Sequence, residues 1–327
     1  MSEPATAVVL LNLGGPDSLD AVEPFLFNLF SDRDIIRGFF GLPLPRFVAR
    51  RIARKRTPIV QENYRLIGGR SPQLELTRRQ GDALARALGL PVFIAMRYWH
   101  PRANETVADL ARQNVRRIVA VTCYPHYSGA TTGSSLRDLE RALAGSGIEL
   151  CAAVDRYADD PGYVSALAET IAEGLAGYPV PARSRAQVLF SAHSLPLTFV
   201  KRGDPYLGEI EKTIAAVVAR LELAGRWHLS FQSRVGRIKW FEPSTAAKLR
   251  ELAAAGHKDV LAVPISFVSD HIETLQEIDI LYKGVADELG VSGFRRCRAL
   301  NDAPAYIQAL ARLVRAALAR VPGAAAA

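Results

Sequence analysis

Short apolar runs alternate with longer amphipathic segments along most of this 327-residue chain. This alternation is typical of strand–helix units that build a parallel sheet covered by helices on both faces. The runs that predict strands are Ala7–Leu13, Val92–Arg97, Arg117–Cys123, Ala186–Ala192, His228–Phe231 and Asp259–Phe267. The helices expected between them are Asp20–Leu29, Leu74–Ala87, Glu105–Gln113, Ser134–Leu143, Asp160–Leu175, Tyr206–Leu223, Ser244–Ala255, Glu273–Glu288 and Ala303–Arg320. The pattern predicts an α/β fold.

The chain is long for a single hydrophobic core, so we expect two domains of roughly 150 residues each. A segment rich in breakers, residues 178–186, separates a helix from a new strand, and the change of domain is expected on its N-terminal side. We assign residues 1–160 to the first domain and 161–327 to the second, with the last helix packing back on the first. The halves resemble loose copies of one doubly wound unit, in which ligands bind beyond the carboxyl ends of the strands.

The amino-acid composition limits which kinds of binding partner and which cellular compartment fit this chain. A net charge of +8 favours an anionic partner such as nucleic acid, an acidic membrane or a carboxylate-bearing small molecule. No nucleic-acid recognition motif accompanies the charge, so we expect no nucleic-acid partner. Cys123, Cys151 and Cys297 are too widely spaced for a zinc ribbon or a disulfide framework and indicate a reducing compartment. Without a signal peptide or a spanning segment, we expect a cytoplasmic location.

Ionisable side chains follow two of the predicted strands. His193 comes directly after Ala186–Ala192, while Asp270 and Glu273 follow the last predicted strand. Asp270, Glu273 and Glu277 have the spacing that places three carboxylates on one face of a helix, where they repel one another unless a cation is present. The alternative is that Asp270 is the N-cap of this helix, that Glu273 completes a capping box, and that Glu277 is solvated. The two strands are therefore expected to place candidate catalytic side chains at one edge of the sheet.

Two other readings of the histidine remain open. A single histidine in a strand–helix turn is usually satisfied by local hydrogen bonds. A zinc hydrolase site could combine His193, His271 and Glu273, but the chain lacks His-Glu-x-x-His or a similarly compact ligand motif. We therefore rank the hydrolase low.

Short sequence motifs give a more specific indication of function than composition does. They are Leu11–Pro16 (LNLGGP), Tyr64–Pro72 (YRLIGGRSP), Tyr124–Ser128 (YPHYS), Thr131–Ser135 (TTGSS), Ser191–Pro196 (SAHSLP), Arg202–Tyr206 (RGDPY), Gln232–Gly236 (QSRVG) and Ser269–Leu275 (SDHIETL). In this order they resemble the signatures of ferrochelatases, the enzymes that insert ferrous iron into a porphyrin at the end of haem synthesis. The ordered set extends over nearly the whole chain and is not a chance match.

The resemblance implies a fold and a reactive centre. It implies two similar Rossmann-type domains, each a parallel sheet flanked by helices, with the active-site cleft between them. It assigns catalysis to His193 and Glu273. Our hypothesis is that these two residues also handle the metal, together with Glu277 and Asp270. Asp270 and His271 have the alternative role of holding the site through hydrogen bonds. Insertion needs a base for two pyrrole protons and hard oxygen donors for Fe²⁺, which is a substrate.

The resemblance also implies side chains that hold and bend the porphyrin. Arg97 is similar to an arginine that relatives place near the propionates, and Ser134 lies in the other such motif. A structural ion pair at a strand end is the alternative for Arg97. The candidates for an apolar clamp are Leu13, Tyr64, Tyr124, Trp240 and Phe231. Ordinary core packing is the alternative for these residues, and it is favoured for Phe231, which stands where many relatives have tryptophan.

Residues 38–56 combine an apolar stretch with six cations. This segment resembles an interfacial membrane anchor, with apolar side chains in the acyl boundary and cations on anionic headgroups. A longer apolar lip, here residues 34–57, accompanies protoporphyrin IX in the family, whereas chains without it include the coproporphyrin III enzymes. We therefore expect protoporphyrin IX. The alternative is a solvated basic helix that covers a hydrophobic face.

The remaining expectations concern cofactors and competing functions. We expect no tightly bound cofactor and no iron–sulfur cluster, because the chain ends without the cysteine-bearing extension of animal relatives, and we expect a monomer. The competing functions are a coproporphyrin III chelatase, an enzyme that inserts cobalt into another tetrapyrrole, and a non-catalytic porphyrin or haem carrier. A proton acceptor opposite a row of carboxylates argues against the carrier.

Overall fold

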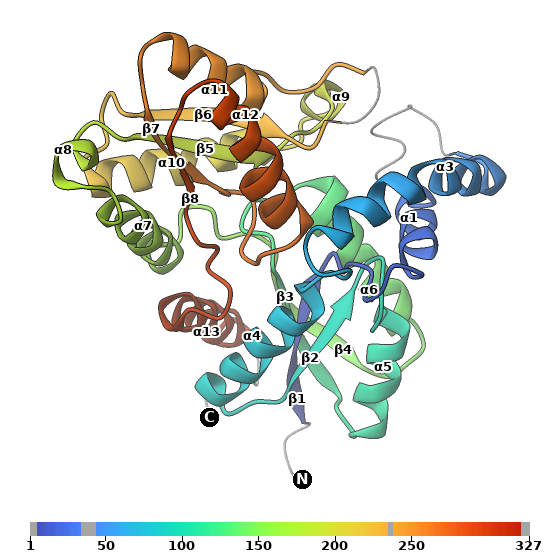
Figure 1. Ribbon diagram of the computed structural model, residues 1–327. Coiled ribbons are helices and arrows are strands. Elements are labelled where there is room, and N and C mark those ends of the chain that lie inside the picture. Colours follow the sequence, from blue (N-terminus) through green and yellow to red (C-terminus); the bar gives the residue numbers. More distant parts are fainter. Residues whose placement is uncertain (1–4, 34–43, 235–237, 322–327) are drawn as a thin grey trace.

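A computed structural model gives the fold and describes residues 5–33, 44–234 and 238–321. The strands in these residues form two four-stranded parallel sheets (Figure 1). The first has the order β2-β1-β3-β4, with β1 at Thr6–Asn12, β2 at Val92–Met96, β3 at Arg117–Thr122 and β4 at Glu149–Val154. The second has the order β6-β5-β7-β8, with β5 at Gln187–His193, β6 at Trp227–Gln232, β7 at Asp259–Val263 and β8 at Gly293–Arg296.

Both sheets follow the same connection order, so the expected pair of similar Rossmann-type domains is confirmed. The helices of the first half are α1 Val22–Phe30, α3 Arg46–Arg65, α4 Gln73–Leu88, α5 Ala103–Arg112, the π-helix η1 Gly129–Gly133 and α6 Ser134–Leu143. Those that follow are α7 Pro161–Ala176, α8 Val180–Arg183, α9 Leu197–Lys201, α10 Tyr206–Leu221, α11 Thr245–Ala254, the π-helix η2 Glu273–Tyr282, α12 Lys283–Glu288 and α13 Pro304–Leu318.

Several elements differ from the sequence expectation. Strands β4 and β8 were not expected. Both are edge strands; β8 has only four residues with Phe294 as its one large apolar side chain, and β4 contains two alanines, which are depleted in strands. Helix α3 was not among the main expected helices, because Pro58 lies inside it and only Ala49, Ala53 and Tyr64 are buried; it corresponds to the basic helix given as the alternative for residues 38–56. Strand β7 ends at Val263 because Pro264, the next residue, has no N–H for a sheet hydrogen bond.

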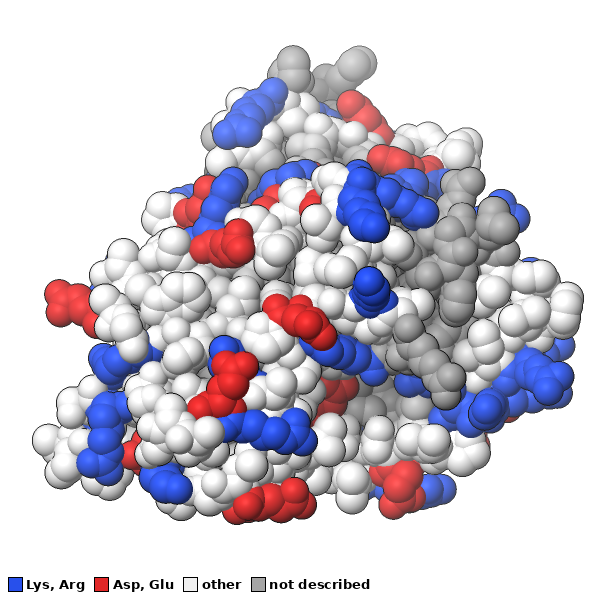
Figure 2. Space-filling model, turned by 90° about the horizontal axis from the view of Figure 1, so that it is seen from above, with Lys and Arg blue, Asp and Glu red and all other residues white. Residues whose placement is uncertain are grey.

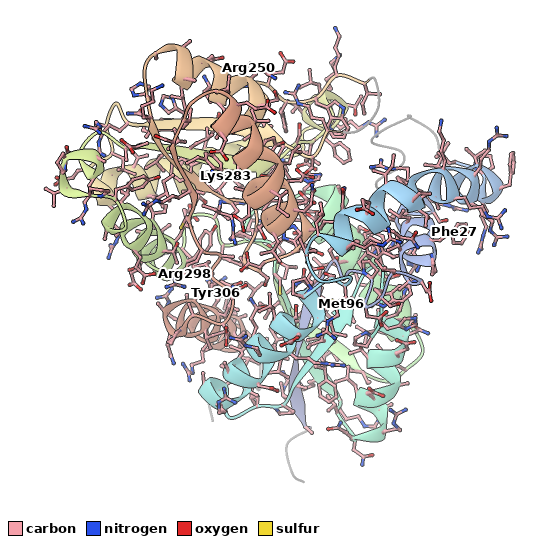
Figure 3. All side chains as sticks on the ribbon, viewed as in Figure 1. Phe27, Met96, Arg250, Lys283, Arg298 and Tyr306 are labelled. Carbon is pink, nitrogen blue, oxygen red and sulfur yellow. The ribbon has the colours of Figure 1, made fainter. Side chains whose placement is uncertain are left out.

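One apolar core continues through both halves. It joins β1 and β3 of the first sheet to β5 and β7 of the second, together with α7, α10 and α13. The C-terminal helix α13 contacts α4 and β4 of the first half as well as α7. Tyr306 of α13, labelled in Figure 3, has its hydroxyl 2.9 Å from that of Tyr157, which donates to the Thr122 carbonyl at 3.1 Å. A boundary at residue 160 stays a prediction.

Loops that follow β3 are tied to the start of α10. The Asp204 carboxylate accepts from the Ser128 hydroxyl at 3.0 Å and from the Gly129 N–H at 2.8 Å. Buried Glu209 accepts from the Tyr127 N–H, and His126 Nε2 lies 2.9 Å from the Thr213 hydroxyl. Residues of two of the motifs, YPHYS and RGDPY, therefore tie the halves together.

Among the residues that the structure describes, no helix is both long and apolar enough to cross a membrane.

Candidate active site

The predicted site residues lie at the points where the strand order reverses. In each sheet the chain leaves the first strand on one side for the second and crosses to the other side for the third. Ligands of doubly wound sheets bind at this point, beyond the carboxyl ends of the strands. Leu13 and Tyr124 follow β1 and β3, and His193 ends β5. The carboxyl ends of the first sheet point toward the second half (Figure 1).

His193 is fixed by its backbone as well as by its ring. Its N–H donates to the Ser266 hydroxyl at 3.3 Å, and its carbonyl accepts from the Tyr206 hydroxyl at 3.0 Å. Its ring atom Nδ1 lies 2.7 Å from Oε2 of Glu273, the first residue of η2. The side chain is 33% exposed and that of Glu273 is 16% exposed. The expected meeting of this imidazole with the acidic segment after β7 is therefore present.

Ser233 joins the two glutamates of η2. Its hydroxyl oxygen lies 2.7 Å from Glu273 Oε2 and 2.8 Å from Glu277 Oε2. A serine hydroxyl has one proton to donate, so both contacts are satisfied when Glu277 carries a proton. Ser233 adopts a left-handed backbone conformation with φ of 64°, which is strained for a residue other than glycine. The neighbouring Gln232 amide donates to the Glu273 carbonyl at 2.8 Å and to Glu277 Oε2 at 3.3 Å.

The pKa values separate the two glutamates. Burial opposes ionisation of Glu273, but the charge and hydrogen bond of His193 outweigh it and hold the Glu273 pKa at about 2. Burial, followed by the Glu273 charge, raises the pKa of Glu277 to about 7. Burial acts to lower the pKa of His193, yet the Glu273 charge raises it above 6.5 overall. Neighbouring carboxyls with separated pKa values are typical of proton-transfer sites.

Asp270 and His271 lie beside the reactive pair. Both carboxylate oxygens of Asp270 are occupied, because Arg296 and Thr274 donate to Oδ1 at 2.8 and 2.9 Å and Asn301 donates to Oδ2 at 2.9 Å. His271 Nε2 lies 3.9 Å from Glu273 Oε1, and burial lowers the His271 pKa. The geometry of Asp270 matches the holding role that the sequence left as the alternative to metal binding.

Tyr64 of the first half reaches the same centre. It belongs to an apolar cluster that also contacts Leu13 and Ile272, the residue before Glu273. Burial and then the Glu273 charge raise the Tyr64 pKa. The Leu11–Pro16 turn fits closely against this segment, since a Cβ on Gly15 would lie 2.4 Å from the Ser71 hydroxyl oxygen. Tyr64 and the cluster against which Leu13 packs therefore lie close to Glu273.

Arg97 and Ser134 lie together in a buried polar network. The Arg97 guanidinium pairs with Asp32 at 2.9 Å and donates to the Ser134 hydroxyl at 2.7 Å. Ser134 and Tyr98 each donate to Asp32 Oδ2 at 2.5 Å. This geometry is the structural ion pair that the sequence left as the alternative for Arg97. A contact of Arg97 or Ser134 with a porphyrin propionate stays a prediction.

The other candidates for the apolar clamp differ in burial and in the residues that they contact. Phe231 is buried and its ring centroid lies 5.0 Å from that of Phe241, which is ordinary core packing. Trp240 is also buried and pairs through its backbone with Pro196, three residues after His193. Tyr124 is half-buried, with its hydroxyl 3.5 Å from that of Ser135. A clamp role for Trp240 and Tyr124 stays a prediction.

Two residues of the site had no predicted role. Ser233 follows β6 at the carboxyl edge of the sheet, and that position in the QSRVG motif was the signal that could have identified it. Asp32 has no local signal, because its partner Arg97 is 65 residues away in the chain. Within the ranges that the structure describes, no three His, Cys, Asp or Glu side chains form a cluster suited to hold a metal ion.

Comparison with known proteins identifies the fold. The sirohydrochlorin chelatase SirB from Bacillus subtilis subspecies spizizenii, solved in complex with cobalt, has a TM-score of 0.55 at 11% identity and covers 96% of this chain and 95% of that chain. SirB from Bacillus subtilis with Fe³⁺ gives a TM-score of 0.54 at 11% identity, covering 95% and 94%. At this identity the likeness shows the fold alone. The chain therefore has the two-domain Rossmann-like α/β fold that these chelatases also have, and its histidine–carboxylate pair lies beyond the carboxyl end of β5.

Sequence relatives identify the family. The sequence profile of the ferrochelatase family matches residues 5–318. The ferrochelatase of Geobacter metallireducens is 54% identical over 320 residues, which covers 97% of this chain and 99% of that protein. That of Nostoc punctiforme is 45% identical over 317 residues, covering 94% and 81%. The chain belongs to the ferrochelatase family: it is a metal chelatase of haem synthesis, a lyase, and its substrates are a porphyrin and ferrous iron.

Proposed function

We propose that this enzyme inserts Fe²⁺ into protoporphyrin IX to form protohaem, with His193 as the proton acceptor. The observation that carries the proposal is the 2.7 Å contact between His193 Nδ1 and Glu273 Oε2. A carboxylate at Nδ1 keeps the proton on that nitrogen and leaves the Nε2 lone pair free to accept another. A non-catalytic carrier would have no use for this tautomer.

The pyrrole protons leave through the acidic side of the site. Two N–H bonds of the porphyrin break, the two protons pass to protein groups, and the ring nitrogens gain the lone pairs that bind iron. His193 accepts the protons one at a time at Nε2 and passes the first from Nδ1 to Glu273 before it accepts the second. The Ser233 hydroxyl connects Glu273 to Glu277, which takes up a proton when it is ionised, and Glu273 stabilises the imidazolium that remains. Glu277, with a pKa near 7, can hold or release a proton at neutral pH. The carboxylate oxygens of Glu273 and Glu277 guide the hydrated iron.

The porphyrin lies between the halves in this proposal, with its macrocycle bent by a rigid wall. Leu13 and Tyr64 form one side, because their cluster contacts Ile272 next to Glu273. Tyr124 and Trp240 extend the wall, while Arg97 and Ser134 meet the propionate edge. Coproporphyrin III remains the second candidate substrate, since it differs only at the ring periphery and would use the same His193–Glu273 centre.

An anaerobic Fe²⁺ insertion assay that compares protoporphyrin IX with coproporphyrin III tests the substrate. We expect kcat/KM to be at least tenfold higher for protoporphyrin IX, equivalent to about 1.4 kcal/mol of differential binding in the transition state. Product haems are separated and quantified by chromatography. A reversed preference would assign coproporphyrin III as the substrate, and equal kcat/KM values would refute selectivity for protoporphyrin IX; both outcomes leave the His193 chemistry intact.

We also propose that α3 attaches the enzyme to an anionic membrane surface. Residues 34–43 of the predicted lip lie outside the described residues, but α3 begins shortly after them, at Arg46. A hollow of about 600 Å³ on α3 is lined by Arg46, Phe47, Arg50, Arg51 and Arg54, and Phe47 is 75% exposed. Arg46 and Arg50 stack on the ring of Phe27, labelled in Figure 3. Lys and Arg gather at the right-hand edge of the face in Figure 2, where α3 lies.

Charge removal on α3 tests this membrane contact. The triple variant Arg46→Gln, Arg50→Gln, Arg51→Gln is expected to weaken binding to vesicles with anionic lipid by about 100-fold, because each cation contributes about 1 kcal/mol. Flotation at low and high salt measures the binding. The matched control removes three exposed arginines elsewhere, Arg78, Arg86 and Arg116. Equal flotation of the wild type and the α3 variant, or equal losses in both variants, would refute the proposal.

The remaining proposals concern cofactor and assembly. We propose that the enzyme works as a cytoplasmic monomer without an iron–sulfur cluster. Cys123 and Cys297 are buried, and burial raises the pKa of Cys297 to about 11, which disfavours the thiolate that a cluster needs.

A further inference from the structure

One arginine connects both ends of the segment that carries Glu273. Arg296 is the last residue of β8, and its side chain is only 12% exposed. Its Nη1 donates to Asp270 Oδ1 at 2.8 Å. Its Nε and Nη2 donate to the two oxygens of Asp279, each at 2.8 Å. Asp270 precedes η2 and Asp279 lies within it, so a single guanidinium holds the chain before and after Glu273 and Glu277.

The Asp270 end of this clamp is rigid. Asn301 accepts from the Asp270 N–H at 2.9 Å and donates to its Oδ2 at 2.9 Å, and Thr274 donates to Oδ1. The Asn301 backbone is itself left-handed, with φ of 47°. Arg296 therefore fixes Asp279 relative to a point that does not turn with the helix.

The π-helical form of η2 needs such support. A π-helix has i→i+5 hydrogen bonds and is rare, occurring mostly as single-turn bulges at functional sites, whereas η2 runs for ten residues, Glu273–Tyr282. A π-helix has about 4.4 residues per turn and an α-helix about 3.6. Each residue therefore turns the chain about the helix axis by roughly 18° more in the α form than in the π form. From Glu273 to Asp279 the accumulated turn is about 110°, which would carry Asp279 away from the guanidinium.

The same change would move Glu277 away from Ser233 while His193 holds Glu273 in place, because Glu277 would pass from one side of Glu273 to the other. Glu273 and Glu277 both contact the Ser233 hydroxyl in the π-helical register. A change to α hydrogen bonding across these four residues would rotate Glu277 relative to Glu273 by about 70°. The observed π register therefore places Glu277 on the Ser233 hydroxyl beside Glu273, and at the same time places Asp279 on the guanidinium that Asp270 also contacts.

We propose that Arg296 is a positioning residue that holds η2 in its π-helical register and thereby keeps Glu273 and Glu277 on Ser233. This role rests on the proposed function of the two glutamates. Arg296 does not touch the reacting atoms, and it acts through Asp270 and Asp279. Loss of the Arg296 side chain leaves the proposed porphyrin wall of Leu13 and Tyr64 in place. We therefore expect porphyrin binding to be retained while the chemical step slows.

The test combines steady-state kinetics with hydrogen exchange. Arg296→Met is expected to lower kcat for iron insertion by about 100-fold, the cost of a misplacement of about 1 Å, with KM for the porphyrin within about twofold of wild type. Amide exchange in residues 273–282 should accelerate, while exchange in β5 and β7 should not. Arg296→Lys should recover part of kcat, because an ammonium can still pair with one carboxylate. Asp279→Asn, a milder change, should accelerate the same exchange if Arg296→Met does not fold.

Arg298→Met is the matched control. Arg298, labelled in Figure 3, lies two residues further on and makes a similar two-pronged pair with Glu173 of α7, at 2.6 and 3.1 Å. This control should leave both kcat and the exchange of residues 273–282 unchanged. An unchanged kcat in Arg296→Met, or a change in KM alone, would overturn the positioning role. The exchange measurement needs no substrate, so a wild-type enzyme that fails to insert iron would refute the proposed function without removing the test of the helix register.

Discussion

His193→Ala is expected to lower kcat for iron insertion by about 10³-fold and to leave porphyrin affinity nearly unchanged. A positioned general base contributes roughly 10²–10⁴ to a rate, and here it removes both pyrrole protons. His193 is held on three sides, by Ser266 and Tyr206 at its backbone and by Glu273 at Nδ1, so no other group can take its place without a shift of β5. Anaerobic initial rates give kcat, and quenching of porphyrin fluorescence gives the affinity.

His228→Ala is the control for this substitution. His228 is a half-buried histidine on the adjacent strand β6, and its ring bonds to the Gln187 side chain at 2.9 Å rather than to the site. We expect wild-type kcat in this variant. A His193→Ala enzyme that keeps more than about one tenth of the wild-type rate would be incompatible with a role for His193 as the base, since that role is worth at least about 100-fold.

Glu273→Gln is expected to reduce kcat by about 100-fold and to move the acid limb of its pH profile to lower pH. Insertion requires a neutral His193, so the limb follows the His193 pKa. The Glu273 charge raises that pKa, and burial alone would lower it. Removing the Glu273 charge therefore lowers the pH at which the His193 imidazole loses its proton. The maximal rate falls because the imidazolium formed in the reaction loses its carboxylate partner. Initial rates between pH 5 and pH 9 measure both effects; an acid limb that stays in place or moves to higher pH would exclude this coupling.

The same substitution has a pH-dependent effect on stability. The His193 pKa is raised on folding, so its part of the stabilisation is complete below about pH 6.5 and is lost as the pH rises through the raised value. The Glu273 pKa is depressed, so its part is complete above about pH 4.5 and is lost as the pH falls toward 2. Glu273→Gln should therefore cost most between pH 4.5 and pH 6.5, as urea midpoints can measure. The control Glu211→Gln, at an exposed position of α10, should show no such window.

The accuracy of the sequence interpretation depended on how local each determinant is. His193 was located because an apolar run ends at it, and Glu273 because a helix begins there, and both are local patterns. The three carboxylates were expected to act as one row. Glu273 and Glu277 do meet at Ser233, whereas Asp270 bonds to Arg296, a residue 26 positions away whose own strand was not expected. Spacing could not reveal that competition.

The amino-acid sequence alone determined six of the eight strands that the structure describes, the segments at which His193 and the acidic helix begin, and, through its ordered motifs, the family. These follow from apolar periodicity and from contacts between near neighbours in the chain. Tertiary structure alone decided that η2 is a π-helix, that Ser233 joins Glu273 to Glu277, and that Asp32 is the buried partner of Arg97. The reason is physical: a buried charge selects the partner that compensates its desolvation, and packing supplies that partner from distant parts of the chain.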